Sequence, residues 1–159
     1  MDLLLIVGEG PVADVLAPMS RLLGWEARVA ATLEDSLAAL PDARAVVVTS
    51  HDLDVAGPSL EAALAGDLVY IGGMGSRKTQ ELRRGYLTDH GVDEELLGRV
   101  RGPAGLDIGA DGPGEIALSI LAELVATVRG RDGTAGSLSG REGPIHPELG
   151  PGEAFCPTG

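Results

Sequence analysis

Cysteine is almost absent from the sequence, and so is any apolar run long enough to cross a membrane. Cys156 is the only cysteine, so no internal disulfide can form and nothing in the cysteine usage indicates secretion. Residues 1–7 have no basic segment before their short apolar stretch, unlike a signal peptide or a membrane span. We therefore expect a cytoplasmic protein whose first apolar run is a buried strand.

Aromatic residues and positive charge are scarce as well. Aromatics make up 3% of the 159 residues and hydrophobic residues 44%, so aliphatic side chains and alanine must fill the core. Twelve basic residues stand against 24 acidic ones, which gives a net charge of −12. This charge argues against a surface for nucleic acid or anionic membranes. Any phosphate-binding site must therefore be local.

Apolar strands and amphipathic helices alternate from residue 3 to residue 128, which predicts an α/β, three-layer Rossmann-like fold with a mainly parallel sheet. The expected strands are residues 3–7, 25–31, 45–49 and 67–71, and the expected helices are 12–23, 33–40, 59–65, 77–89, 93–100 and 113–129. The short span before the third strand indicates that one strand of the usual sheet is missing. Residues 1–129 should form the domain. Residues 130–159, rich in glycine and proline, should be a tail that is flexible or packed on the domain or a partner.

The segment between the fourth expected strand and the next helix has the pattern of an anion site. The strand runs into Gly72, Gly73 and Gly75, where the backbone can approach a ligand closely, and Ser76 is placed to cap the helix. The unpaired N–H groups and the dipole at the helix start favour an anion, and Arg77 adds a full positive charge. The alternative is a tight turn with solvated basic residues.

The turn after the first strand contains Gly8 and Gly10 in the pattern G-x-G-x-x-A, which is typical of a dinucleotide site. Such a site uses an acidic residue at the end of the second strand, where this sequence has Ala30-Ala31-Thr32. An oxidoreductase that binds NAD(P) or another nucleotide is therefore the alternative function and not the leading one. Gly8 and Gly10 stay candidates for binding a phosphate.

His51 and Asp52 follow the third strand, and the carboxyl ends of parallel strands share one edge of a sheet. An imidazole there can bind a ligand oxygen, ligate a metal or move a proton. The alternative is that Asp52 and Asp54 cap a helix beginning near Pro58, with His51 an ordinary loop residue. No nucleophile and base stand close together, so the sequence assigns no catalytic residue, and no metal site is expected.

The helices of the second half should each bury one face. Leu82, Tyr86 and Leu87 share a face of their helix, while Arg83 and the charged residues beside it lie mostly elsewhere. The helix of residues 113–129 is more apolar than one covered face requires. We therefore expect a homodimer.

Several motifs follow one another in a fixed order: TSHDLD (49–54), YIGGMGSR (70–77), GLDIGA (105–110) and PGEIALSILAE (113–123), with GPIH (143–146) after them. Together they resemble the Rossmann-like C-terminal domain of the XdhC/CoxI family. The resemblance covers residues 3–128 and the short GPIH element. Members of that family usually carry a cysteine-containing segment before this domain, and the present chain starts at the first strand, so we expect the role of that segment to be absent here or supplied by another polypeptide.

The resemblance implies an accessory factor of a molybdenum hydroxylase such as xanthine dehydrogenase or an aerobic carbon monoxide dehydrogenase. Such a factor binds molybdenum cofactor (molybdopterin), protects it and passes it to the apoenzyme, as a chaperone and not as a catalyst. A cysteine desulfurase that sulfurates the cofactor is a further candidate partner. A different possibility is a subunit that binds no small molecule and serves only as a partner surface.

Molybdopterin carries a phosphate, which the glycine turns could hold with Ser76 and Arg77. The expected cofactor site combines the two glycine turns, the His-Asp turn and one acid of the GLDIGA motif. Its residues are Gly8, Gly10, His51, Asp52, Gly72, Gly73, Gly75, Ser76, Arg77 and Asp107.

Overall fold

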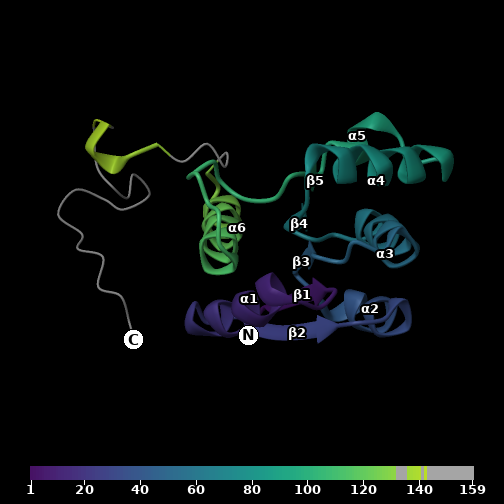
Figure 1. Cartoon of the computed structure of the whole chain (residues 1–159), viewed down its shortest axis with the longest axis horizontal. Coiled ribbons are helices and arrows are strands. Elements are labelled where there is room, and N and C mark those ends of the chain that lie inside the picture. Colours follow the sequence, from purple (N-terminus) through teal and green to yellow (C-terminus); the bar gives the residue numbers. More distant parts are fainter. Residues whose placement is uncertain (132–135, 141, 143–159) are drawn as a thin grey trace.

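The computed structural model describes residues 1–131, 136–140 and 142, and its elements are shown in Figure 1. The GPIH motif and Cys156 lie outside the described residues. In chain order the elements are β1 (Leu3–Val7), α1 (Pro11–Leu22), β2 (Glu26–Ala30), α2 (Leu33–Ala39), η1 (Leu40–Asp42), β3 (Ala45–Val48), α3 (Leu53–Ala65), β4 (Tyr70–Gly73), α4 (Arg77–Asp89), α5 (Glu94–Leu97), β5 (Val100–Arg101), α6 (Pro113–Val128) and η2 (Leu138–Gly140).

The strands form one five-stranded sheet in the order β2-β1-β3-β4-β5, and every pairing in it is parallel. All residues of β1 and β3 are buried, because both faces of these central strands are covered. At one edge β2 is mostly exposed, and at the other β5 has two residues. The predicted α/β Rossmann-like fold with a mainly parallel sheet is confirmed.

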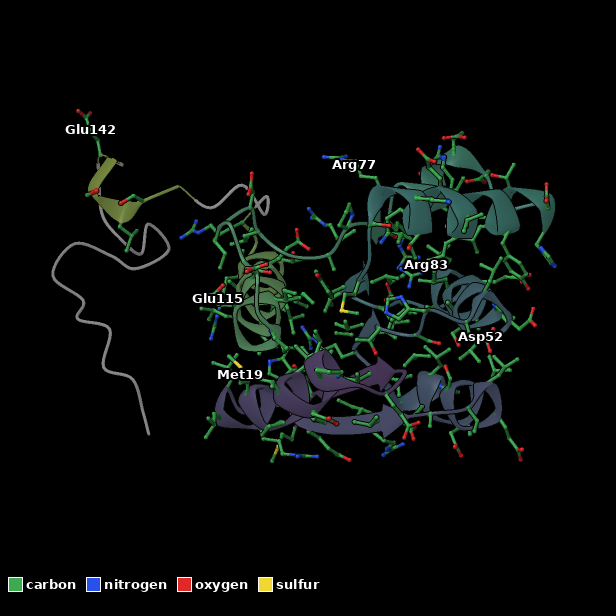
Figure 2. The ribbon with its side chains drawn as sticks, viewed as in Figure 1. Met19, Asp52, Arg77, Arg83, Glu115 and Glu142 are labelled. Atoms are coloured by element: carbon green, nitrogen blue, oxygen red, sulfur yellow. The ribbon has the colours of Figure 1, made fainter. Side chains whose placement is uncertain are left out.

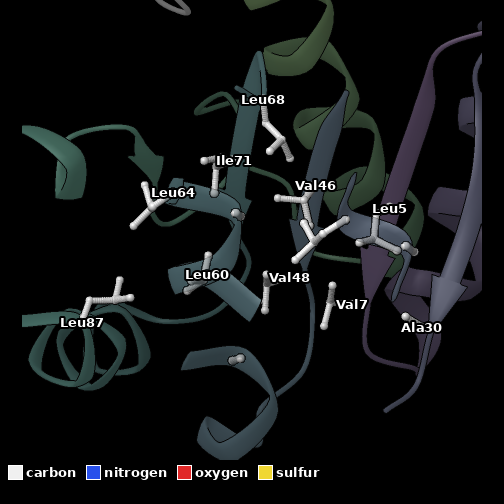
Figure 3. Packing of buried hydrophobic residues seen from close by; sticks show 14 of the residues in the cluster. Leu5, Val7, Ala30, Val46, Val48, Leu60, Leu64, Leu68, Ile71 and Leu87 are labelled. Atoms are coloured by element: carbon white, nitrogen blue, oxygen red, sulfur yellow. The ribbon is translucent and has the colours of Figure 1, made fainter. Parts of the chain in front are cut away.

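Helices cover both faces of the sheet and give the three layers. Figure 1 shows α1 and α6 on one face and α2, α3 and α4 on the other. Leu5 and Val7 of β1 point into the core under α2–α4, which Figure 3 shows from close by. Leu4 and Ile6 point into the core under α1 and α6. No helix in the described part of the chain is long and apolar enough to cross a membrane.

The third helix begins earlier than the sequence predicts. α3 starts at Leu53, because the Asp52 carboxylate accepts the N–H of Asp54 at 2.9 Å and caps the helix. Pro58 is the sixth residue of α3 instead of marking its start. There its missing N–H removes one main-chain hydrogen bond, which the buried face of the helix offsets.

The fourth strand begins three residues later than predicted and continues to Gly73. Gly72 and Gly73 therefore belong to β4 and not to the turn. A Cβ on Gly72 would lie 2.7 Å from the ring of Tyr70, and one on Gly73 would lie 3.0 Å from Oε1 of Gln80. These two glycines therefore make room for neighbouring side chains. β5, which the sequence did not predict, pairs with β4 where the fifth helix had been expected to continue.

The buried face of α4 is also different from the predicted one. Leu82 is 57% exposed, whereas Arg83 and Leu87, four residues apart, form the buried stripe. Other apolar positions that the helical or strand spacing placed inside are exposed as well: Leu22 and Leu23 at the end of α1, Val29 of the edge strand and Leu37 of α2. Spacing alone does not fix which of two adjacent stripes faces the core.

Truncation of a buried residue of α6 should cost far more stability than truncation of an exposed one. Ile120 is fully buried and Leu118 is 51% exposed. We expect Ile120→Ala to lower the free energy of unfolding by about 2–5 kcal/mol, because it leaves a cavity, and Leu118→Ala to change it by about 0.5 kcal/mol at most. Urea unfolding measures both, and equal losses would contradict the packing of α6.

Candidate functional site

The register of the sheet brings four strand ends to one level. Ala30 of β2, Val7 of β1, Val48 of β3 and Gly73 of β4 lie opposite one another in turn. The ladder then continues one step, because the N–H groups of Gly8, Thr49 and Met74 donate to the carbonyls of Ala30, Val7 and Val48 at 2.8–2.9 Å. The turns after β1, β3 and β4 therefore start side by side.

The crevice of this fold lies between the ends of β1 and β3. From β1 the chain crosses to β2 on one side and then returns to β3 on the other, so the helices after β1 and β3 cover opposite faces. This reversal opens a crevice outside the carboxyl ends of the strands, where doubly wound proteins bind ligands.

Gly8 and Gly10 form the wall of the crevice on the β1 side, and both have positive φ angles, 121° and 115°. A Cβ on Gly8 would lie 2.5 Å from the main-chain N of Ser50, so this glycine allows the turns after β1 and β3 to touch. Gly10 is the N-cap of α1, with no side-chain cap and no atom within 4 Å of where its Cβ would be. Pro11 is the first helical residue and carries no N–H, so the donors at the start of α1 begin with Val12.

Gly75, Ser76 and Arg77 form the wall on the β4 side. Gly75 has a φ of 126°, and the Ser76 hydroxyl caps α4 by accepting the N–H of Thr79 at 3.3 Å. The predicted capping role of Ser76 is confirmed. Figure 2 shows Arg77 projecting away from the start of α4, and its guanidinium makes no hydrogen bond or ion pair to the residues that the structure describes.

His51 and Asp52 lie in the turn after β3, and both are exposed. The Asp52 side chain caps α3, as the alternative interpretation of this turn predicted, and its own N–H donates to the Ser50 hydroxyl at 3.2 Å. The imidazole of His51 contacts no polar group of the described chain. His51 is therefore available to a ligand, while Asp52 is already used by the helix.

The segment between β5 and α6 is anchored to the end of β4 and to α6. The N–H of Ala104 donates to the carbonyl of Gly73 at 2.9 Å, and the N–H of Leu106 donates to the carbonyl of Ser119 at 3.1 Å. Gly105 donates to the buried carboxylate of Glu123 at 3.1 Å. This anchoring holds the exposed Asp107 just beyond the end of β4.

Glu123 also accepts the phenol hydrogen of Tyr70 at 2.7 Å. Both side chains are buried. Burial, and then the adjacent Glu123 carboxylate, raise the pKa of Tyr70 far above its usual value. The pair connects β4, α6 and the covering segment, and neither residue was singled out from the sequence.

Arg83 was expected mostly away from the buried face, and this prediction is wrong. The side chain is 3% exposed, and Figure 2 shows it under α4. Its Nη1 donates to the carbonyl of Met74 at 2.6 Å, and its Nη2 donates to the carbonyl of Ser50 at 2.8 Å. The guanidinium thus ties the turns after β3 and β4 together. The one available signal was its spacing of four residues from Leu87.

Gln80 supports the same turn from the preceding helical turn of α4. Its side-chain amide donates to the carbonyls of Gly73 at 2.9 Å and Gly75 at 3.1 Å. Arg83 has no ion pair among the described residues, and burial lowers its pKa, though a guanidinium stays protonated at any ordinary pH. The site therefore has a buried positive charge behind its main-chain walls.

The fold and these turns define a doubly wound α/β domain with an anion-type crevice at the β1/β3 reversal. The chain belongs to the XdhC family, whose Rossmann domain it matches over residues 4–124. The family resemblance drawn from the sequence motifs is confirmed.

Two relatives come from Escherichia coli K12. One is the molybdenum cofactor insertion chaperone PaoD, which is 33% identical over 127 residues, with 79% of this chain and 40% of PaoD covered. The other, the uncharacterized protein YqeB, is 29% identical over 146 residues, with 77% of this chain and 26% of YqeB covered. The chain thus spans less than half the length of these relatives.

A solved structure shares the fold. The crystal structure of a xanthine dehydrogenase from Bacillus halodurans aligns with a TM-score of 0.66 and 27% identity, over 82% of this chain and 44% of that one. The fold of this chain is therefore shared with that solved structure.

Replacement of Arg83 should loosen the turns that it joins. In Arg83→Met the carbonyls of Ser50 and Met74 lose their charged donor, and we expect the free energy of unfolding to fall by about 2–4 kcal/mol. The control is Arg84→Met, where only an exposed ion pair to Glu94 is lost, with an effect of about 0–1 kcal/mol. Urea unfolding with amide exchange of both turns measures the difference. Equal stability of the two variants would contradict the role of Arg83 in joining the two turns.

The raised pKa of Tyr70 predicts a loss of stability at high pH. Because the phenol loses its proton more readily in the unfolded chain than beside Glu123, its contribution is complete below about pH 10 and declines as the pH rises further. The difference in the free energy of unfolding between wild type and Tyr70→Phe should therefore be smaller at about pH 11 than at about pH 9. A constant difference would contradict the coupling.

Proposed function

We propose that the protein binds molybdenum cofactor and serves as an accessory chaperone in the maturation of a molybdenum hydroxylase of the xanthine dehydrogenase or carbon monoxide dehydrogenase type. The observation that carries the proposal is the crevice, in which the uncapped start of α1 at Gly10 and the unpaired cation Arg77 lie along one sheet edge. Membership of the XdhC family and the likeness to PaoD support it.

The crevice offers what the phosphate of molybdopterin requires. Pro11 has no N–H, so the donors at the start of α1 are the N–H groups of Val12 and Ala13, where no side chain caps the helix and the dipole favours an anion. One strand separates β1 from β4, so the strand ends at Val7 and Gly73 lie about 10 Å apart, a span that a phosphate attached to a pterin can bridge. His51 and Asp107 then face the rest of the cofactor.

This proposal gives the chain a holding role and not a catalytic one. When bound, the cofactor supplies the molybdenum centre that the recipient enzyme uses. The chain's own residues bind the phosphate through main-chain N–H groups and Arg77, and the segment fixed by Glu123 covers the ligand. Gly72 and Gly73 lie within β4 and act indirectly, by leaving room for Tyr70 and for Gln80, which supports the turn after the strand.

The proposal includes a cytoplasmic apo-hydroxylase as recipient and a cysteine desulfurase as a further partner. It also includes a homodimer, for which the supporting feature is the outer face of α6, where Leu118 and Val125 are exposed. A subunit that binds no cofactor and acts only through this face is the alternative of a different class. In this alternative, a disruptive substitution at Leu118 would abolish function, and neither the wild type nor the variant would bind the cofactor.

NAD(P) or nucleotide binding is the competing use of the same glycine turn. β2 ends at Ala30, and Thr32 caps α2 while its hydroxyl donates to the carboxylate of Asp35 at 2.8 Å. No acid stands at the strand end itself, and Asp35 in the first turn of α2 is already bonded to Thr32, which disfavours the ribose contact of a dinucleotide site.

Removal of the crevice cation should weaken cofactor retention. We expect Arg77→Ala to raise the dissociation constant for released molybdenum cofactor about tenfold or more, because a charge-assisted hydrogen bond to phosphate is lost. Lys78→Ala, one residue further along α4, is the matched control and should change it about twofold at most. The measurement is cofactor retained after gel filtration, together with activation of an apo-hydroxylase.

Two results would overturn the proposal. One is wild-type protein that neither retains the cofactor nor raises activation of the apo-hydroxylase. The other is calorimetric binding of NAD or NADP at micromolar concentration, which would move the function to the nucleotide-binding alternative.

A further inference from the structure

A cavity of about 260 Å³ lies on the far side of Arg83 from the crevice, between α4, α5 and β5. Its apolar part is formed by Leu60 of α3, Leu87 of α4 and Leu97 of α5. No residue of the turns after β1 and β3 lines it. The cavity is thus separate from the crevice, although the two adjoin at Arg77.

The polar part of the cavity is strongly cationic for so acidic a protein. Arg77, Arg83 and Arg84 line it, and Glu81 is the one acid among its lining residues, which gives 3 − 1 = +2. Half of the twelve basic residues of the chain, six in number, lie in residues 77–101. The positive charge of the sequence is therefore concentrated around this cavity.

The charge of Arg83 is balanced by no carboxylate in the described part of the chain. Its acceptors are the two turn carbonyls and Oε1 of Gln80 at 3.4 Å, all neutral, and burial lowers its pKa. A buried cation with only neutral partners is costly, and an anion in the adjoining cavity lowers that cost.

We propose that this cavity binds a compact organic monophosphate, with the phosphate held by the arginines and an apolar body resting on the leucines. The charges of Arg77 and Arg84, with the buried charge of Arg83 behind them, suit a dianion better than a monoanion. The three leucines, which form the floor of the cavity, offer the apolar group of the ligand a surface on which it is removed from water. The volume lies below the range of about 300–1,000 Å³ usual for drug-sized ligands, so the ligand is small.

Glu94 competes with the ligand for Arg84. The Arg84 guanidinium makes an ion pair with the carboxylate of Glu94, and both side chains are largely exposed. α5 supplies this competitor and also the apolar Leu97 of the floor. Binding of the phosphate therefore requires the Arg84–Glu94 pair to open, and removal of Glu94 should favour the ligand.

Titration of the full chain with phenyl phosphate, inorganic phosphate and phenol tests the proposal, with calorimetry for affinity and amide NMR shifts for location. We expect phenyl phosphate to bind about tenfold more tightly than inorganic phosphate, since only it uses the floor. Arg84→Gln should weaken its binding about fivefold, and Glu94→Gln should strengthen it about two- to fivefold. Lys78→Gln, on the same helix and outside the cavity, is the control and should leave it unchanged.

Shifts confined to α4, α5 and β5 would support the site. Equal affinities for phenyl phosphate and inorganic phosphate would overturn it, and so would wild-type affinity in Arg84→Gln or shifts centred on the turn at Gly8. None of these readouts uses molybdenum cofactor, so failure here leaves the proposed chaperone function standing, and failure of that function leaves this site standing.

Discussion

The buried guanidinium of Arg83 is the interaction on which the geometry of the sheet edge depends. A parallel ladder aligns the ends of β3 and β4, but it cannot fix the turns beyond them, whose carbonyls no longer face a neighbouring strand. Arg83 donates to one carbonyl in each turn, at Ser50 and Met74. Because both acceptors are neutral, the tie leaves a positive charge between the crevice and the cavity. The same bond thus sets the shape of the edge and its preference for anions.

The loop over the crevice is held by one face of α6. Glu115, Ser119 and Glu123 are spaced four residues apart, so they lie on one side of the helix. The carboxylates of Glu115 and Glu123 accept main-chain N–H groups of the loop, from Asp111 at 2.9 Å and from Gly105 at 3.1 Å, and between them the main-chain carbonyl of Ser119 accepts the N–H of Leu106. The PGEIALSILAE motif therefore acts as a clamp for the GLDIGA segment, which explains why the two motifs occur together.

Much of this fold could be predicted from local sequence, because local rules decide it. The apolar runs of β1 and β3 and the capping residues Ser76 and Asp93 follow from burial and from hydrogen bonds within one turn. Gly8 and Gly75 were recognisable as turn glycines for the same reason, and both have positive φ.

The rest depends on partners that are distant in sequence. Arg83 is charged, so its spacing of four residues from Leu87 did not predict that it is buried, and the apolar Leu82 was expected on the buried face. Only the distant carbonyls of Ser50 and Met74 explain the burial of Arg83, because they accept its hydrogen bonds. Gly72 looked like a turn glycine because nothing local indicates its pairing with Val47 of β3 and Arg101 of β5, which extends the strand through it. Glu123 likewise finds its donors 53 and 18 residues away in the chain.

The charge distribution decides how such an acidic chain can hold an anion at all. With a net charge of −12, the protein as a whole repels phosphate at long range, but at physiological ionic strength this repulsion is screened beyond about 8 Å. Within that distance the ligand experiences the start of α1, the unpaired Arg77 and the buried Arg83, which salt screens far less. Local donors therefore outweigh the net charge, while the acidic remainder of the surface disfavours polyanions such as nucleic acids, whose binding needs an extended basic face. The selectivity that we propose for a small phosphate ligand rests on this contrast between a short-range cationic edge and a long-range negative field.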